Sequence, residues 1–308
     1  MSLVASIHPG SFFDLNRLPG ADAVTKSFTL MENILGEQPG TFATAGEWDF
    51  EVIRVGGSEF LWMDRSISPP VSRALRLDAY AVAAHTAQRR TLLVGALGRL
   101  AEAHAEQFGH VAMFVRNLFW LSLRDPNTSI TRITSSSDPA LPFAIMFTDK
   151  AAQHIPPNTV ITGASSRLLA ENILHESVHQ RISQTILTRK LFAPEYSSQT
   201  SPKIEITWRA DQGSERNQWW EVDRAFHAAF VYNSLLRFRL TELSRNDLNS
   251  LERQAFADAL AEGVDAVTYL VSELLRNRTL FTDEGNVELN ELEAETGIAV
   301  ELWQNWRA

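Results

Sequence analysis

Two histidines four residues apart, with a glutamate directly after the first, give this sequence its clearest chemical signal. They are His175, Glu176 and His179, in the segment ILHESVHQ. Because residues i and i+4 share one face of an α-helix, the two imidazole rings can direct nitrogens at one point. Neutral imidazole binds zinc, iron, copper and nickel. The spacing therefore predicts a metal site on a helix, with a carboxylate beside it.

The residues around the histidines predict that this helix is largely buried. Leu174, Val178, Ile182 and Ile186 continue an apolar stripe next to the histidine face. Burial makes unpaired polar groups costly, and a bound metal with hydrogen-bonded ligands is one way to satisfy them. The alternative is a pair of structural histidines that match the spacing by accident.

A third ligand must come from elsewhere, because a catalytic metal commonly takes three protein ligands and keeps further positions open. The segment WWEVDRAFHAAFVYN, residues 219–233, offers His227, with Asp223 on the same helical face. We expect His227 to complete the site and Asp223 to orient the ring of His227 without binding the metal itself. Glu221 is the alternative, because many two-histidine metalloproteases take a glutamate from a later helix.

These motifs occur in a familiar order. ILHESVHQ, followed by ITWRADQ (206–212) and VDRAFHAAFVYN (222–233), resembles the HExxH-domain proteins of bacterial gene clusters for ribosomally made peptide natural products. The resemblance covers roughly residues 165–235. It implies modification of a precursor peptide by an iron(II)- and 2-oxoglutarate-dependent oxygenase, with hydroxylation at a β-carbon of a peptide side chain.

The resemblance also assigns roles to single residues. It makes His175, His179 and His227 the metal ligands, and Arg209 the residue that binds the co-substrate 2-oxoglutarate. A guanidinium suits this role because its planar fork binds a carboxylate through two hydrogen bonds. Arg224 is the reserve candidate for binding the co-substrate.

Glu176 has a different role in each function that stays open. In a zinc peptidase that trims a leader peptide, it would be the general base that takes a proton from metal-bound water. In an oxygenase it would instead hydrogen-bond a ligand, the co-substrate or the peptide. A third function is a non-catalytic peptide-binding protein stabilised by its metal, which would not require this glutamate.

Composition limits the remaining choices. The chain has 308 residues and a formal net charge of -9, which argues against nucleic-acid binding because phosphate recognition needs clustered Lys and Arg. It has no cysteine, so His, Asp or Glu must hold any metal. We identify neither a secretion signal nor a transmembrane segment, and therefore expect a cytoplasmic protein without a membrane partner.

The apolar periodicity predicts a mainly α protein with a small central β-sheet, an α+β fold in which long helices carry the metal site. We expect one domain over residues 1–308, with 165–235 as its metal-binding core. Its long C-terminal helices could support a homodimer. The predicted helices cover residues 21–35, 71–108, 165–192, 217–243 and 246–278. The predicted strands fall within residues 50–63, 110–124, 130–133, 143–147 and 203–208.

Overall fold

The computed structural model describes residues 15–42, 49–64, 69–128, 133–156, 159–208 and 218–307. Helices make up most of it, alongside a small mixed sheet, so the expected fold class is confirmed. The chain groups into two compact units, Met1–Arg181 and Ile182–Ala308. The division falls inside helix α5 (Ser166–Thr188), and the expected single domain over residues 1–308 stays a prediction. No described helix is both long and apolar enough to cross a membrane.

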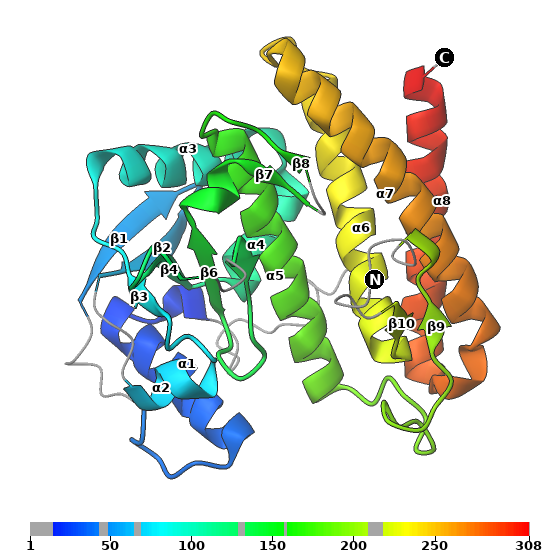
Figure 1. Ribbon diagram of the computed structural model, residues 1–308. Coiled ribbons are helices and arrows are strands. Elements are labelled where there is room, and N and C mark those ends of the chain that lie inside the picture. The colour runs from blue at the N-terminus through cyan, green and yellow to red at the C-terminus, as the bar shows by residue number, and fades with distance from the viewer. Residues whose placement is uncertain are drawn as a thin grey trace. The chain divides into compact units, whose positions relative to one another are not determined.

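The first unit is built on a mixed sheet (Figure 1). Its order is β1-β2-β4-β6-β5, with β3 paired to β4. Neighbours β2, β4 and β6 run parallel, whereas β1, β3 and β5 pair antiparallel. The strands are β1 (Phe50–Val55), β2 (Ser58–Met63), β3 (Tyr80–Val82), β4 (Asn117–Leu123), β5 (Ser135–Ser136) and β6 (Ala144–Thr148). The short strand β5 therefore ends the sheet on the β6 side.

Alternating side chains of the sheet enter two apolar layers, as the period of two in a strand requires. On one layer Phe28 of α1 (Gly20–Leu35) belongs to a core cluster with Phe119 and Met146. The neighbouring residue of β4, Trp120, instead makes an edge-on contact with Phe147 at 4.9 Å between ring centroids. The side chains of Trp120 and Phe147 are both almost fully buried, so the central strands are covered on both faces.

The prediction of one long helix over residues 71–108 is wrong. This region contains α2 (Pro69–Ala74), β3, α3 (Ala87–Ala103) and the start of α4 (Ala105–Phe114). Arg76 adopts a left-handed backbone, with φ of 56°, and Tyr80–Val82 pairs with β4 as strand β3. Thr86 then caps α3 by accepting a hydrogen bond from the backbone N–H of Arg89. Strand pairing thus overrides the helical preference of an Ala-rich segment.

Other sequence predictions hold in part. The helix over 21–35 is confirmed as α1, and the strands within 50–63 are confirmed as β1 and β2, which form a hairpin. The segment 110–124 begins as helix α4 and becomes strand only at Asn117. Most of the strand expected at 130–133 lies outside the described residues.

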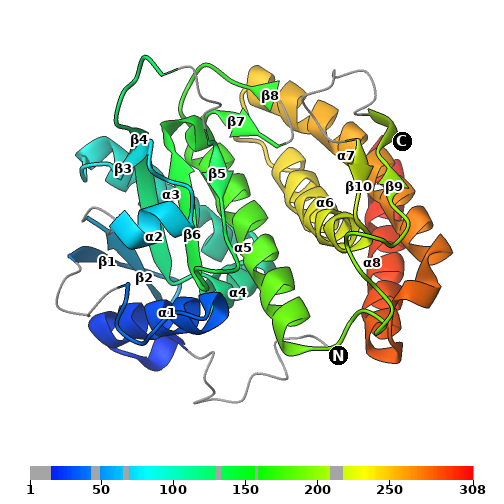
Figure 2. The same ribbon diagram turned by 60° about the horizontal axis from the view of Figure 1, so that its bottom comes forward.

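The second unit is helical, and α6, α7 and α8 run beside one another (Figures 1 and 2). Their bounds are Val222–Leu243, Ser250–Arg276 and Asp283–Arg307. The predicted helix over 217–243 starts only at Val222, because Trp219–Trp220 forms strand β10 and pairs with β9 (Ile204–Glu205). Inside the bundle, the fully buried Arg239 donates a hydrogen bond of 2.7 Å to the carbonyl of Ala259. That bond ties α6 to α7.

Candidate metal centre

Helix α5 is buried at every position from Arg167 to Thr185 except three, which are His175, His179 and Arg181. The predicted apolar stripe is buried as expected over its first three residues. The two histidines are half-buried, with the side chain of His175 22% exposed. Both rings thus come from a well-packed helix and still keep access to solvent.

The two rings converge as the spacing predicts. Nε2 of His179 lies 3.2 Å from Nε2 of His175. Two imidazoles bound to one cation at about 2.1 Å, and separated by roughly 90–110°, would place these atoms about 3.0–3.4 Å apart. The same distance also suits a hydrogen bond between the rings when one of them carries the Nε2 proton. The pair therefore has the geometry of two metal ligands without large rearrangement.

Glu176 lies between this pair and the interior of the first unit. Its side chain is only 3% exposed. Oε1 lies 3.9 Å from Nε2 of His175, while Oε2 accepts a hydrogen bond of 2.7 Å from the hydroxyl of Ser137. The glutamate thus presents one oxygen toward the histidine pair and has the other bound on the sheet side.

Glu176 is the middle member of a polar row on the inner side of α5, made of Asn172, Glu176 and Gln180. The amide nitrogen of Asn172 donates to the carbonyls of Ala151, His154 and Leu168 at 2.9–3.0 Å. Its amide oxygen accepts a hydrogen bond from the hydroxyl of Ser135 at 3.1 Å. These bonds fix the N-terminal end of the row to β5 and to the chain that follows β6.

Gln180 fixes the other end of the row. Its amide nitrogen donates to the carbonyls of Asp138, Leu141 and Ala144 at 2.9–3.2 Å. Its amide oxygen accepts a hydrogen bond of 3.3 Å from the backbone N–H of Phe143, a residue with a left-handed φ of 60°. The row thus holds the segment from β5 to β6 against α5, and Ser137 sits within that segment.

In the second unit, His227 lies on α6 and is half-buried. Burial lowers the pKa of its imidazole, while the charge of Asp223 and a hydrogen bond with the backbone of Ile182 act in the opposite direction. A depressed pKa favours the neutral ring, which is the form that binds a metal. A ring nitrogen bonded to a backbone group is also the usual arrangement of a metal-binding histidine.

Asp223 lies one helical turn before His227 and is itself fixed. Its Oδ1 accepts a hydrogen bond of 2.6 Å from the hydroxyl of Tyr196, whose oxygen accepts one from the backbone N–H of Asp223. Burial and this carboxylate raise the pKa of Tyr196 well above its usual range. The tyrosine therefore stays a hydrogen-bond donor, and it holds the group predicted to orient His227.

The sequence offers three further candidates, one for binding the metal and two for binding the co-substrate. Glu221 precedes α6, and its Oε1 accepts a hydrogen bond of 2.9 Å from Nζ of Lys203, which lowers the pKa of Glu221. Arg224 is exposed, with its guanidinium carbon 4.8 Å from the ring centroid of Trp220. Arg209 lies outside the described residues. The co-substrate roles of both arginines stay predictions.

The complete ligand set is also still a prediction. Among the described residues, no three His, Asp or Glu side chains are grouped so that they could hold a metal ion together. His175 and His179 belong to the first unit and His227 to the second. What the first unit supplies by itself is a pair of converging imidazoles and an adjacent carboxylate.

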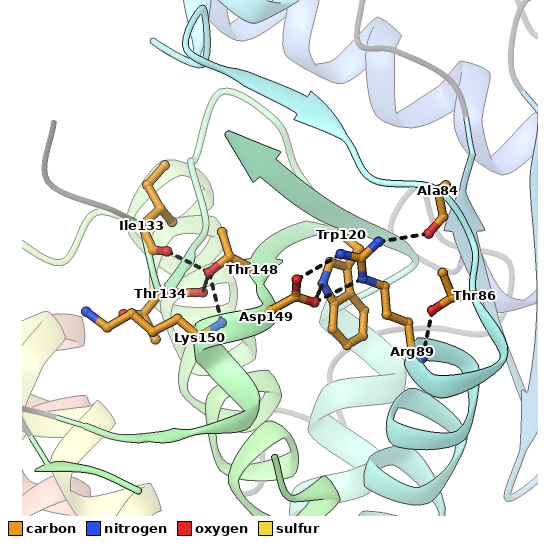
Figure 3. A network of polar contacts seen from close by, with 9 residues as sticks. All are labelled: Ala84, Thr86, Arg89, Trp120, Ile133, Thr134, Thr148, Asp149 and Lys150. Atoms are coloured by element: carbon orange, nitrogen blue, oxygen red, sulfur yellow. Dashed lines mark hydrogen bonds and ion pairs between the residues drawn. The ribbon is translucent and has the colours of Figure 1, made fainter. Parts of the chain in front are cut away.

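A second polar cluster lies at the end of β6, where Asp149 follows the strand (Figure 3). Its carboxylate accepts hydrogen bonds from Nε and Nη2 of Arg89 at 3.0 and 2.8 Å, and from Nε1 of Trp120 at 2.8 Å. Two hollows of about 280 and 240 Å³ share Asp149 as part of their walls. The cluster clamps the start of α3 to the sheet, because Arg89 lies in its first turn.

Sequence reasoning missed Ser137. A serine in a Ser-rich turn carries no motif that distinguishes it from its neighbours, and only the packing of α5 against the sheet brings it to Glu176. Compared with known proteins by sequence, the chain matches neither any model of a protein family nor any curated protein.

Proposed function

We propose that this protein is an iron(II)- and 2-oxoglutarate-dependent oxygenase that hydroxylates a side chain of a ribosomally made precursor peptide, at a β-carbon. The metal would be held by His175, His179 and His227. The partner is the precursor peptide, and we place the reaction in the cytoplasm. The resemblance of residues 165–235 to the HExxH-domain proteins of peptide gene clusters gives the reaction its class.

One observation carries the metal site: the Nε2 atoms of His175 and His179 converge to 3.2 Å on the partly exposed face of an otherwise buried helix. A pair of imidazole nitrogens without any thiolate suits iron(II) as well as zinc. Three imidazoles would leave three octahedral positions, which is enough for a bidentate co-substrate and dioxygen. Support for His227 comes from its low pKa and its bond to the backbone of Ile182.

Iron(II) with 2-oxoglutarate would supply dioxygen activation and insertion of one oxygen atom into a carbon–hydrogen bond, with succinate and carbon dioxide as co-products. The chain's own residues would bind and orient. Arg209 would hold the distal carboxylate of 2-oxoglutarate through its guanidinium fork, with Arg224 in reserve. Glu176 would accept a hydrogen bond from a group bound beside the histidine pair. The long helices of the second unit could pair two copies of the chain.

The second candidate is a zinc peptidase that trims a leader peptide. The position of Glu176 favours it, because Oε1 lies 3.9 Å from Nε2 of His175, where a general base could reach metal-bound water. A non-catalytic protein that binds a peptide and keeps the metal for stability is the third candidate. It gives no reason for a buried carboxylate fixed at this place.

Peptide mass and succinate formation would separate the three candidates. The apo protein is incubated with a candidate precursor peptide, with iron(II), 2-oxoglutarate and air in one tube and zinc in another. A peptide heavier by one oxygen, with succinate formed in the iron tube, supports the oxygenase. Peptide fragments in the zinc tube support the peptidase. An unchanged peptide that binds tightly in both tubes supports the binding protein.

A further inference from the structure

Ser137 is the residue through which the sheet side of the first unit reaches Glu176. It directly follows β5, and its hydroxyl donates to Oε2 of Glu176 at 2.7 Å. A serine hydroxyl has one proton, so this bond uses its whole donor capacity. An O–H···O distance of this length is typical of a well-formed bond.

The backbone around Ser137 is fixed from both sides by the same helix. Two residues earlier, the hydroxyl of Ser135 donates to Asn172, and one residue later the carbonyl of Asp138 accepts from Gln180. Strand β5 is further paired with β6 through Ser135 and Ser136. The hydroxyl of Ser137 therefore comes from a rigid backbone and can impose an orientation on the carboxylate.

The orientation that results is specific. With Oε2 bound to Ser137, Oε1 is the oxygen that lies toward His175, at 3.9 Å from its Nε2. A carboxylate without such a bond can rotate about its last torsion, which is broad in glutamate. Holding one oxygen thus determines where the other one points.

We propose that Ser137 is a positioning residue for Glu176: it binds Oε2 so that Oε1 is held ready to accept a hydrogen bond from a water, hydroxyl or amide group bound beside His175 and His179. This inference rests on the proposed metal site. It holds for either chemistry there, because a general base and an orienting acceptor both require a fixed carboxylate oxygen.

The test compares Ser137→Ala with Ser137→Thr, which keeps the hydroxyl, and with Ser135→Ala as matched control. Ser135→Ala removes the same group two residues away, from a bond to Asn172 instead of Glu176. Each full-length variant is checked for its melting temperature and loaded with cobalt(II), and the visible spectrum and the cobalt dissociation constant are recorded. Glu176→Gln serves as the reference for a lost carboxylate.

In the expected result, all serine variants bind cobalt within about twofold of the wild type. Ser137→Ala shifts the spectrum in the same direction as Glu176→Gln, whereas Ser137→Thr and Ser135→Ala keep the wild-type spectrum. With the substrate found for the wild type, kcat of Ser137→Ala falls by no larger a factor than that of Glu176→Gln, which is about 10-fold or more if Glu176 is a general base and less if it only orients a group, while KM changes little.

Two other results have separate meanings. If the wild type binds no cobalt at the histidine pair, the proposed metal site fails and this inference fails with it. If cobalt binds and Glu176→Gln changes the spectrum, but Ser137→Ala behaves like Ser135→Ala, the metal site stands and the positioning role of Ser137 is overturned.

Discussion

The imidazoles of His175 and His179 approach each other through their Nε2 atoms, 3.2 Å apart, from successive turns of one helix. Their rings are tilted by 57°, with centroids 4.9 Å apart, so the nitrogens meet without the rings stacking. This distance suits two ligands of a single cation as well as a hydrogen bond between the rings, and it is set entirely within α5.

Replacing either histidine should abolish tight metal binding. We expect His175→Ala and His179→Ala each to weaken cobalt or zinc affinity by more than about 100-fold, because even residues that only orient ligands cost about 10–100-fold. Isothermal titration of the apo protein measures this. His110→Ala, a histidine of α4, is the control and should bind like the wild type. Equal affinity in all three variants would place the metal elsewhere.

The third ligand can be assigned by comparing His227→Ala with Glu221→Gln. If His227 completes the site, its loss weakens metal affinity about 10-fold or more, while Glu221→Gln has no effect because Glu221 already pairs with Lys203. The opposite ranking would make Glu221 the ligand. Competition with a chromogenic chelator gives both dissociation constants under the same conditions.

Glu176→Gln separates the two chemistries. In a peptidase it removes the general base and should lower kcat by about 10²–10⁴-fold. In an oxygenase the amide can keep a hydrogen bond to the site, so hydroxylation should persist at a substantial fraction of the wild-type rate. Product masses from single-turnover reactions measure both. An oxygenase reaction that this change abolishes would assign Glu176 a proton-transfer role.

The polar row on α5 should be essential for stability. Asn172→Asp replaces an amide nitrogen, which shares its two hydrogens among three carbonyls, by a carboxyl oxygen facing the same carbonyls, at a position only 1% exposed. We expect the free energy of unfolding to fall by about 3 kcal/mol or more. Urea denaturation followed by circular dichroism measures it. Asn127→Asp, in an exposed turn, should change it little.

Low pH should weaken the hydrogen bonds that Asp149 accepts from Arg89 and Trp120. The hydrogen bond from Arg89 lowers the pKa of this carboxyl, so its contribution to stability is complete above the ordinary aspartate pKa and is lost as pH falls below it. Because the Asp149 side chain is 66% exposed, we expect Asp149→Asn to destabilise by at most about 1 kcal/mol at pH 7.

Urea unfolding of Asp149→Asn and the wild type at pH 7 and near pH 3 tests this, and the difference should shrink at the lower pH. Asp78→Asn, which changes an exposed aspartate of the same unit, is the control. A difference that grows on acidification would contradict the direction of the pKa shift.

Much of the fold could be predicted from sequence where the signal is local. The helix that carries His175 shows regular apolar spacing, and the Gly56–Gly57 turn marks the hairpin. Residues 71–108 could not be predicted in this way. Their alanines favour helix, but the left-handed Arg76 and the pairing of β3 with β4 depend on partners distant in the chain.

The candidate site, like the fold, could be predicted from sequence only where the signal is local. The i, i+4 spacing of His175 and His179 is a property of one helix, so sequence was sufficient to predict that they share a face. The bond between Ser137 and Glu176 joins residues 39 positions apart, and depends on how β5 packs against α5. No local pattern encodes that packing.

Helix α5 carries two period-four patterns, offset by one residue. His175 and His179 form the pattern whose side chains are partly exposed. Asn172, Glu176 and Gln180 form the buried pattern, which is hydrogen-bonded to the sheet and its connecting segments. A single inserted residue between 172 and 180 would turn everything after it by about 100°. Insertions and deletions here would thus break chemistry and fold at once, whereas point replacements can damage them separately.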